Sequence, residues 1–126
     1  MRKIIRLNTH PYPTKVWFTA DVEAFQRHRT KITGRAPEEV GLGQCSATDD
    51  RGTMVIGVFD GDTSTLVHEI GHAVVNVFHY VGMDINLHTT EAFSYLLDSL
   101  YSQANQHLNK STPAHDGLRT ESEETE

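Results

Sequence analysis

Hydrophobic and polar residues alternate over short runs in the first half of the chain, which is the pattern of half-buried β-strands. Pro11 and Pro13 interrupt this pattern after the first run. A four-residue loop that ends in Gly52 joins the last two runs, which predicts a hairpin at or near one edge of a sheet. The predicted strands cover residues 3–8, 15–19, 40–48 and 53–59.

Three further segments carry apolar residues at helical spacing, each after residues that commonly cap helices. The second of these helices is expected to begin after Asp62, Thr63 or Ser64 and to end before Gly82. The predicted helices follow caps at residue 21, at residues 62–64 and at residues 89–90, and end near residues 31, 81 and 108. The order β-β-α-β-β-α-α predicts one α+β domain over residues 1–110 with a small, mostly antiparallel sheet.

Composition and charge narrow the possible partners. The chain has 126 residues and a formal net charge of −6, and the segment 111–126 holds five carboxylates against Arg119. This segment is expected to be an acidic, disordered C-terminal tail. Because the rest of the chain has no basic patch, no nucleic-acid partner is expected. Neither a signal peptide nor a membrane span is apparent, and Cys45 is the single cysteine, so we expect a cytoplasmic protein without a membrane partner.

The second predicted helix contains the pattern His-Glu-x-x-His at His68, Glu69 and His72. Residues four apart share one face of an α-helix, so the two imidazoles can bind one Zn²⁺. Glu69 is rotated by about 100° from His68 and can act as the general base on a zinc-activated water. Apolar residues surround the motif, and such a helix rarely carries these polar groups unless they are paired or ligated. Gly71, inside the helix, is expected to mark close packing.

A catalytic zinc site needs a third protein ligand. Glu91 follows His72 by nineteen residues and begins the third predicted helix, which an antiparallel helix pair would return towards the motif. His88 and Cys45 are the alternative third ligands. His79 is less suitable, because it would lie about 10 Å beyond His72 on a continuous helix.

These segments resemble a known class of enzymes. Residues 68–72, His-Glu-Ile-Gly-His, followed by residues 90–95, Thr-Glu-Ala-Phe-Ser-Tyr, resemble the gluzincin zinc metallopeptidases. In that class a second motif, Asn-Glu-x-x-Ala, supplies the third ligand, which implies Glu91 here; Thr90 and Ser94 replace the Asn and the Ala. The stretch is also similar, over about residues 15–101, to small predicted peptidases of tailed bacteriophages, which implies a minimal zincin-like fold and the host cytoplasm.

Other polar residues are candidates for supporting roles. Asp98, seven residues after Glu91 on the same helix face, is a candidate partner for His68 or for the residues before it. His88, Tyr95 and Tyr12 are the candidates for stabilising the oxyanion of a tetrahedral intermediate. The hairpin is the expected place for an extended peptide to bind by strand addition, with Gly41 and Gly43 marking a bulge or a close approach.

The sequence therefore predicts a zinc-dependent hydrolase, most simply a metalloendopeptidase acting on a peptide or protein substrate as a monomer or homodimer. His68, His72 and Glu91 are the expected zinc ligands, and Glu69 is the expected general base. Two alternatives stay open: a zincin-like protein that binds zinc and a host protein without proteolysis, and an amidase that acts on non-peptide substrates, including a deformylase-like enzyme with Cys45 as a ligand.

Overall fold

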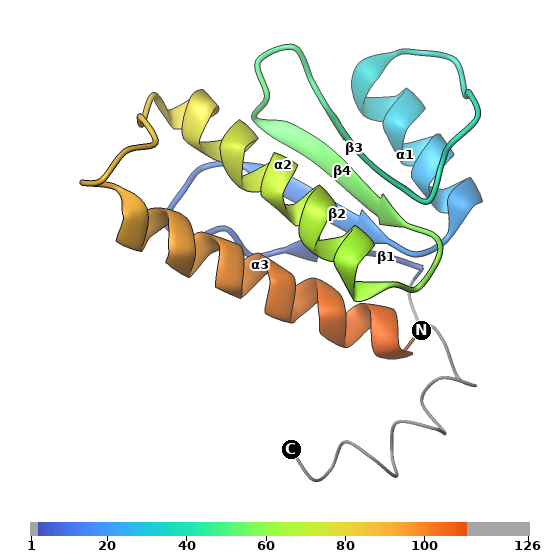
Figure 1. Ribbon diagram of the computed structural model, residues 1–126. Coiled ribbons are helices and arrows are strands. Elements are labelled where there is room, and N and C mark those ends of the chain that lie inside the picture. Colours follow the sequence, from blue (N-terminus) through green and yellow to red (C-terminus); the bar gives the residue numbers. More distant parts are fainter. Residues whose placement is uncertain (1–2, 111–126) are drawn as a thin grey trace, which may run out of the picture.

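A four-stranded sheet and three helices make up the described part of the chain, residues 3–110, in the computed structural model (Figure 1). The strands are β1 (Ile4–Leu7), β2 (Lys15–Thr19), β3 (Gly43–Ala47) and β4 (Thr53–Val58), and the helices are α1 (Val22–Thr33), α2 (Thr63–Val81) and α3 (Thr90–Lys110). This order confirms the predicted succession of elements and the α+β class. The predicted acidic tail, residues 111–126, lies outside the described residues.

The strands lie in the order β1-β2-β4-β3. The pairs β1–β2 and β3–β4 are antiparallel, and β2–β4 is parallel, so the predicted mostly antiparallel sheet is correct. Strand β3 is an edge strand, and its pairing with β4 continues without a break from Gly43 to Ala47, so the bulge expected at Gly43 is absent. The strand begins later than residue 40, where the sequence placed it, because the segment before it is bonded to α1; Gln26 of α1 donates to the carbonyl oxygen of Glu38 at 2.8 Å.

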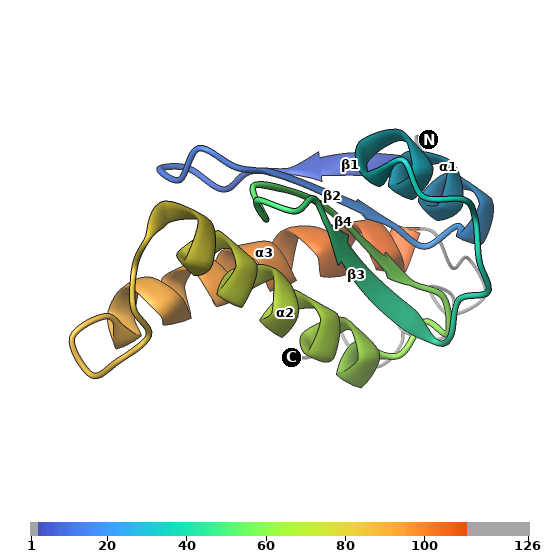
Figure 2. The same ribbon diagram turned by 90° about the horizontal axis from the view of Figure 1, so that it is seen from above.

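The sheet separates the helices into two layers. Helix α1 covers one face, whereas α2 and α3 lie side by side on the other (Figure 2). The alternation of β-strands sends every second side chain to the α2–α3 face, where the main core forms. The fully buried core residues on this face include Val16, Phe18, Met54, Ile56, Val58, Leu66, Ile70, Val74, Val77, Phe78 and Leu100.

Helix α2 begins and ends where the sequence predicts. The Asp62 side chain accepts a hydrogen bond from the backbone N–H of Ser64 at 2.9 Å, which satisfies one of the free donors of the first turn. Gly82 ends the helix in the left-handed conformation, with φ 76°, and its N–H bonds to the carbonyl of His79. No helix among residues 3–110 is both long enough and apolar enough to cross a bilayer.

Candidate metal centre

The apolar stripe of α2 fixes where the motif residues lie. Leu66, Ile70 and Val77 are completely buried against the sheet and α3. This places His68 and His72 on the exposed side of the helix, while Glu69 lies on the flank next to β3 and is only 7 % exposed. The local sequence thus sets both imidazoles in reach of solvent and shields the carboxylate between them.

The side chains of His68, Glu69 and His72 form a potential metal-binding group. One donor atom from each residue lies within 4.8 Å of the other two, and among residues 3–110 only these three residues form such a group. The two imidazole rings have centroids 4.9 Å apart and stand at 79° to each other. Two imidazoles and a carboxylate are a donor set that suits Zn²⁺ and related divalent ions, so the residues present fit a metal.

Glu69 owes its position to a glycine on the neighbouring strand. A Cβ added to Gly43 would lie 3.2 Å from Cγ of Glu69 and 2.6 Å from Cγ2 of Thr65. Gly43 therefore lets α2 approach β3 closely; of the bulge and the close approach that the sequence allowed, Gly43 makes a close approach, here to a helix. Burial at this place raises the pKa of the Glu69 carboxyl, and the neighbouring His68 and His72 partly offset that rise. A carboxyl with a raised pKa is better suited to accept and return a proton near neutral pH.

Gly71 has a different environment from the one expected. A Cβ added to Gly71 would meet nothing within 4 Å, so the predicted close packing at this residue is wrong. No side chain or backbone atom of residues 3–110 covers Gly71, and the neighbouring His68 and His72 are exposed. The flank beside the two imidazoles is thus free to receive a ligand.

Cys45 lies beside the group without being part of it. Its Sγ accepts a hydrogen bond from Nδ2 of Asn76 at 3.9 Å, and the residue is half-buried on β3. Burial, followed by the negative charge of Glu69, raises the pKa of the Cys45 thiol to about 12. Cys45 is not among the residues whose donor atoms lie close together, and the structure therefore gives no support to Cys45 as a third ligand.

The structure does not bring Glu91 into the group. Glu91 is exposed in the first turn of α3 and lies outside the set of mutually close donor atoms. The two helices run in opposite directions (Figure 1). The rings of Phe78 and Phe93 are 5.5 Å apart. Phe78 is six residues after His72, or about 9 Å along the axis of α2. Glu91 precedes Phe93 by two residues, which adds about 3 Å in the same direction because the helices are antiparallel. Glu91 therefore lies about 12 Å from His72 along the helix axis. Its role as a ligand stays a prediction.

The remaining candidates are dispersed. His88 and Asp98 are exposed, on the α2–α3 connection and on α3, and neither belongs to the group. Tyr95 is 71 % exposed, whereas Tyr12 is half-buried and packs against Phe78, with ring centroids 6.2 Å apart. The contacts of these side chains do not single out one of them as the group that would stabilise an oxyanion.

Two residues near the group were missed by sequence reasoning. Asn76, 9 % exposed, follows His72 by one helical turn and accepts a hydrogen bond from Nη1 of Arg51 at 3.0 Å. A polar residue between Val75 and Val77, in phase with the motif, was the signal that could have identified Asn76. Arg51 belongs to the hairpin loop, and no sequence pattern places it beside α2.

Comparisons with protein-family models, with curated proteins and with solved structures find no match for this chain. The case for a function therefore depends on the site itself.

Proposed function

We propose that this protein is a zinc-dependent hydrolase, most simply a metallopeptidase. The observation that carries the proposal is the close group of His68, Glu69 and His72, with both imidazoles exposed and the carboxylate shielded. A structural zinc site is normally closed by four protein ligands, whereas a catalytic site leaves a position for water. The open flank at Gly71 favours the catalytic alternative.

The roles of the residues follow from their positions. His68 and His72 would hold the ion through ring nitrogens. The resemblance to gluzincins implies Glu91 as a third ligand, although Glu91 lies outside the group in this structure. When bound, zinc supplies Lewis acidity and lowers the pKa of a coordinated water to about 7. Glu69 takes the proton of the attacking water and passes it to the leaving amine. The shielded position of Glu69 supports this role, because desolvation brings a carboxyl pKa closer to the working pH.

The edge of the sheet next to the group favours an extended peptide as the substrate. The N–H of Thr48 donates to the carbonyl of Thr53, and the N–H of Phe59 donates to the carbonyl of Leu42. The backbone N–H and C=O groups of the even-numbered residues of β3 therefore point towards β4. The backbone groups of Gly43, Cys45 and Ala47 therefore point away from the sheet, and no other residue in the range 3–110 bonds to them. An added peptide strand would find free donors and acceptors directly beside Glu69.

Metal content and a general-base variant test the proposal. Purified full-length protein should bind one zinc ion per chain, and His68→Ala should lose it, while His79→Ala, which removes an exposed histidine from the same helix, should not. Glu69→Gln should keep the zinc and lose hydrolysis of a peptide library analysed by mass spectrometry. Absence of stoichiometric zinc in the wild type, or hydrolysis that persists in Glu69→Gln, would contradict the proposal.

A further inference from the structure

A polar cleft follows the open edge of β3. Its volume is about 360 Å³. Asn76 of α2 and Arg51 of the hairpin loop line one side, and Arg29, Arg35 and Glu38 line the other. Because Cys45 and Ala47 also line the cleft, it contains the free backbone groups of the edge strand. A chain that pairs with β3 would therefore run along this cleft.

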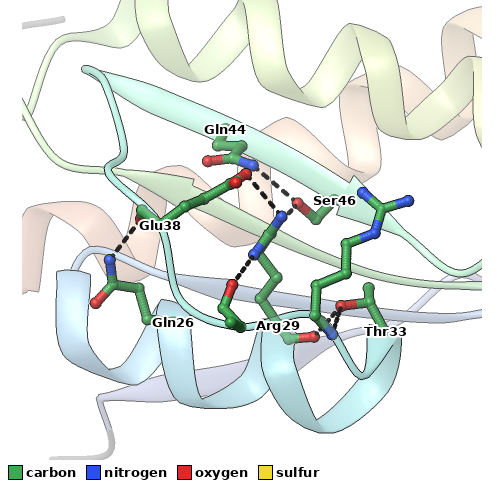
Figure 3. A network of polar contacts seen from close by, with 8 residues as sticks. Gln26, Arg29, Thr33, Glu38, Gln44 and Ser46 are labelled. Carbon is green, nitrogen blue, oxygen red and sulfur yellow. Dashed lines mark hydrogen bonds and ion pairs between the residues drawn. The ribbon is translucent and has the colours of Figure 1, made fainter.

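The side of the cleft formed by Arg29 and Glu38 is held together by hydrogen bonds and an ion pair. Arg29, 3 % exposed, donates to Oγ of Ser46 at 3.1 Å and to the carbonyl of Ala36 at 3.2 Å, and pairs with Glu38 at 2.8 Å (Figure 3). These bonds tie α1, the segment before β3 and the strand itself together. They use three of the five N–H donors of Arg29, and Glu38 neutralises this buried cation.

Arg51 is different, because its charge has no such partner. The two ion pairs within residues 3–110 join Lys3 to Asp21 and Arg29 to Glu38, so no carboxylate of that range lies within 4.0 Å of the Arg51 guanidinium. Its hydrogen bond goes to the neutral amide of Asn76 instead. Asn76 is in turn oriented by its second bond, to Cys45. The guanidinium is therefore positioned at the cleft with most of its donors unused.

The backbone at Arg51 gives an independent reason to look for a function. Arg51 has φ 63° and is the only residue other than glycine with positive φ in the described chain. Glycine or asparagine adopts this conformation at lower cost, and both are common at such a turn position. Arg51 keeps this less favourable conformation while its side chain is hydrogen-bonded to Asn76 of α2. Backbone outliers of this kind are common at functional sites.

We propose that Arg51 is a specificity residue that binds a carboxylate of the substrate, held in the cleft beside the open edge of β3. Guanidinium groups bind carboxylates through paired, charge-assisted hydrogen bonds. The carboxylate can come from an Asp or Glu side chain or from the C-terminus of the peptide. This inference rests on the proposed peptidase function, since it names a feature of the substrate of that site.

The position of the preferred carboxylate follows from the helix. Asn76, which holds Arg51, is one turn beyond His72 and two turns beyond Glu69, or about 6 Å and about 10 Å along the axis. An extended chain advances about 3.3 Å per residue. The carboxylate therefore belongs to a residue two or three positions from the bond that lies at the metal-binding group.

Binding of blocked peptides measures this preference without requiring cleavage. The protein would be the full-length, zinc-loaded Glu69→Gln variant, and the probes would be fluorescein-labelled decapeptide pools with Glu or Gln fixed at one position and the other positions random. Fluorescence anisotropy should show that Glu pools bind at least about tenfold more tightly than Gln pools at one or two adjacent positions. A Gln pool with a free C-terminal carboxylate identifies the terminal group as the source if it alone binds tightly.

Changes at Arg51 decide the interpretation. Arg51→Gln should make Glu and Gln pools bind equally, and Arg51→Lys should keep part of the preference. Arg51→Gly should abolish it with little change in Tm, because the backbone conformation that glycine favours offsets the lost hydrogen bond to Asn76, and this separates recognition from folding. Arg27→Gln, at an exposed arginine of α1, is the matched charge control and should change nothing.

Equal binding of all pools by the parent protein, no binding of any pool, or a preference that survives Arg51→Gln would overturn the inference. The proposed peptidase function has separate criteria, namely zinc content and loss of hydrolysis in Glu69→Gln. A protein that hydrolyses peptides but shows no Arg51-dependent preference would keep the first proposal and reject the second.

Discussion

The ring of Phe93 in α3 lies against the ring of Phe78 in α2, with centroids 5.5 Å apart and planes at 73°. This contact sets how far the two antiparallel helices are displaced along each other. It places the start of α3 beside the C-terminal end of α2 rather than beside the histidines, and so it bears directly on the third ligand.

The first prediction concerns Glu91. With α3 packed in this way, Glu91→Gln should bind zinc within about threefold of the wild type, whereas His72→Ala should weaken binding by more than about 100-fold, since even loss of a group that only orients a ligand costs 10–100-fold. Isothermal titration with zinc in a competing chelator measures both. A large loss in Glu91→Gln would instead establish the gluzincin ligand set and would require α3 to move when the metal binds.

The second prediction concerns the close approach at Gly43. Gly43→Ala places a methyl group 2.6 Å from Thr65 and 3.0 Å from the carbonyl oxygen of Gly57, so α2 and β3 must separate. We expect a loss of about 1–3 kcal/mol in the free energy of unfolding, as for other overpacked sites. Peptide hydrolysis should fall as Glu69 is displaced, while zinc is retained.

Gly41→Ala is the matched control for this variant. A Cβ at Gly41 meets nothing within 4 Å, and the residue lies just before the same strand. Urea denaturation should give a change close to zero for Gly41→Ala. Equal stability of the two variants would show that Gly43 is not what allows the close approach.

The third prediction concerns Gly71. Glycine inside a helix is less favourable than alanine by about 1 kcal/mol, and the space at this position is open. Gly71→Ala should therefore raise the free energy of unfolding by about that amount in the zinc-free protein and leave zinc affinity unchanged. A destabilised variant would mean that a group covers this flank in solution.

The fourth prediction concerns pH and His28. Its ring packs on Trp17, with centroids 4.8 Å apart, and burial, followed by the charge of Lys31, lowers the pKa of His28 below 6.5. The unfolded chain then takes up a proton near pH 6.5 before the folded chain does, so the contribution of His28 to stability is present above that pH and is lost as the pH falls through it. Urea denaturation at pH 7.5 and 5.0 should show a smaller pH dependence for His28→Gln than for the wild type. An unchanged difference would exclude His28 as a contributor.

The sequence predicted the elements better than their relative placement. Helix α2 could be predicted from its apolar period and from the capping residues Asp62 and Gly82, because these interactions are local. The parallel pairing of β2 with β4 could not, because it depends on contacts between distant segments. The spacing between His72 and Glu91 suggested a returning helix, but α2 continues for nine residues after His72, and α3 therefore begins beyond the motif.

In the candidate site, too, the local features could be predicted from the sequence and the contacts between distant segments could not. His68, Glu69 and His72 share one turn of helix, so helical geometry alone brings them together. The Arg51–Asn76 hydrogen bond joins a loop to a helix across 25 residues of sequence, and only the folded chain reveals it. Arg51 was not identifiable in advance, because its left-handed backbone conformation runs against the preference of its residue type.

The glycine opposite Glu69 also makes the shielding of this carboxylate depend on correct strand pairing. A slip of one residue between β3 and β4 would turn every side chain of β3 to the opposite face. Leu42 or Gln44 would then stand where Gly43 stands, and α2 would have no room to dock with Glu69 against the strand. A chain with a misregistered hairpin would keep the three residues on one turn of α2, but Glu69 would lose the strand that shields it from solvent.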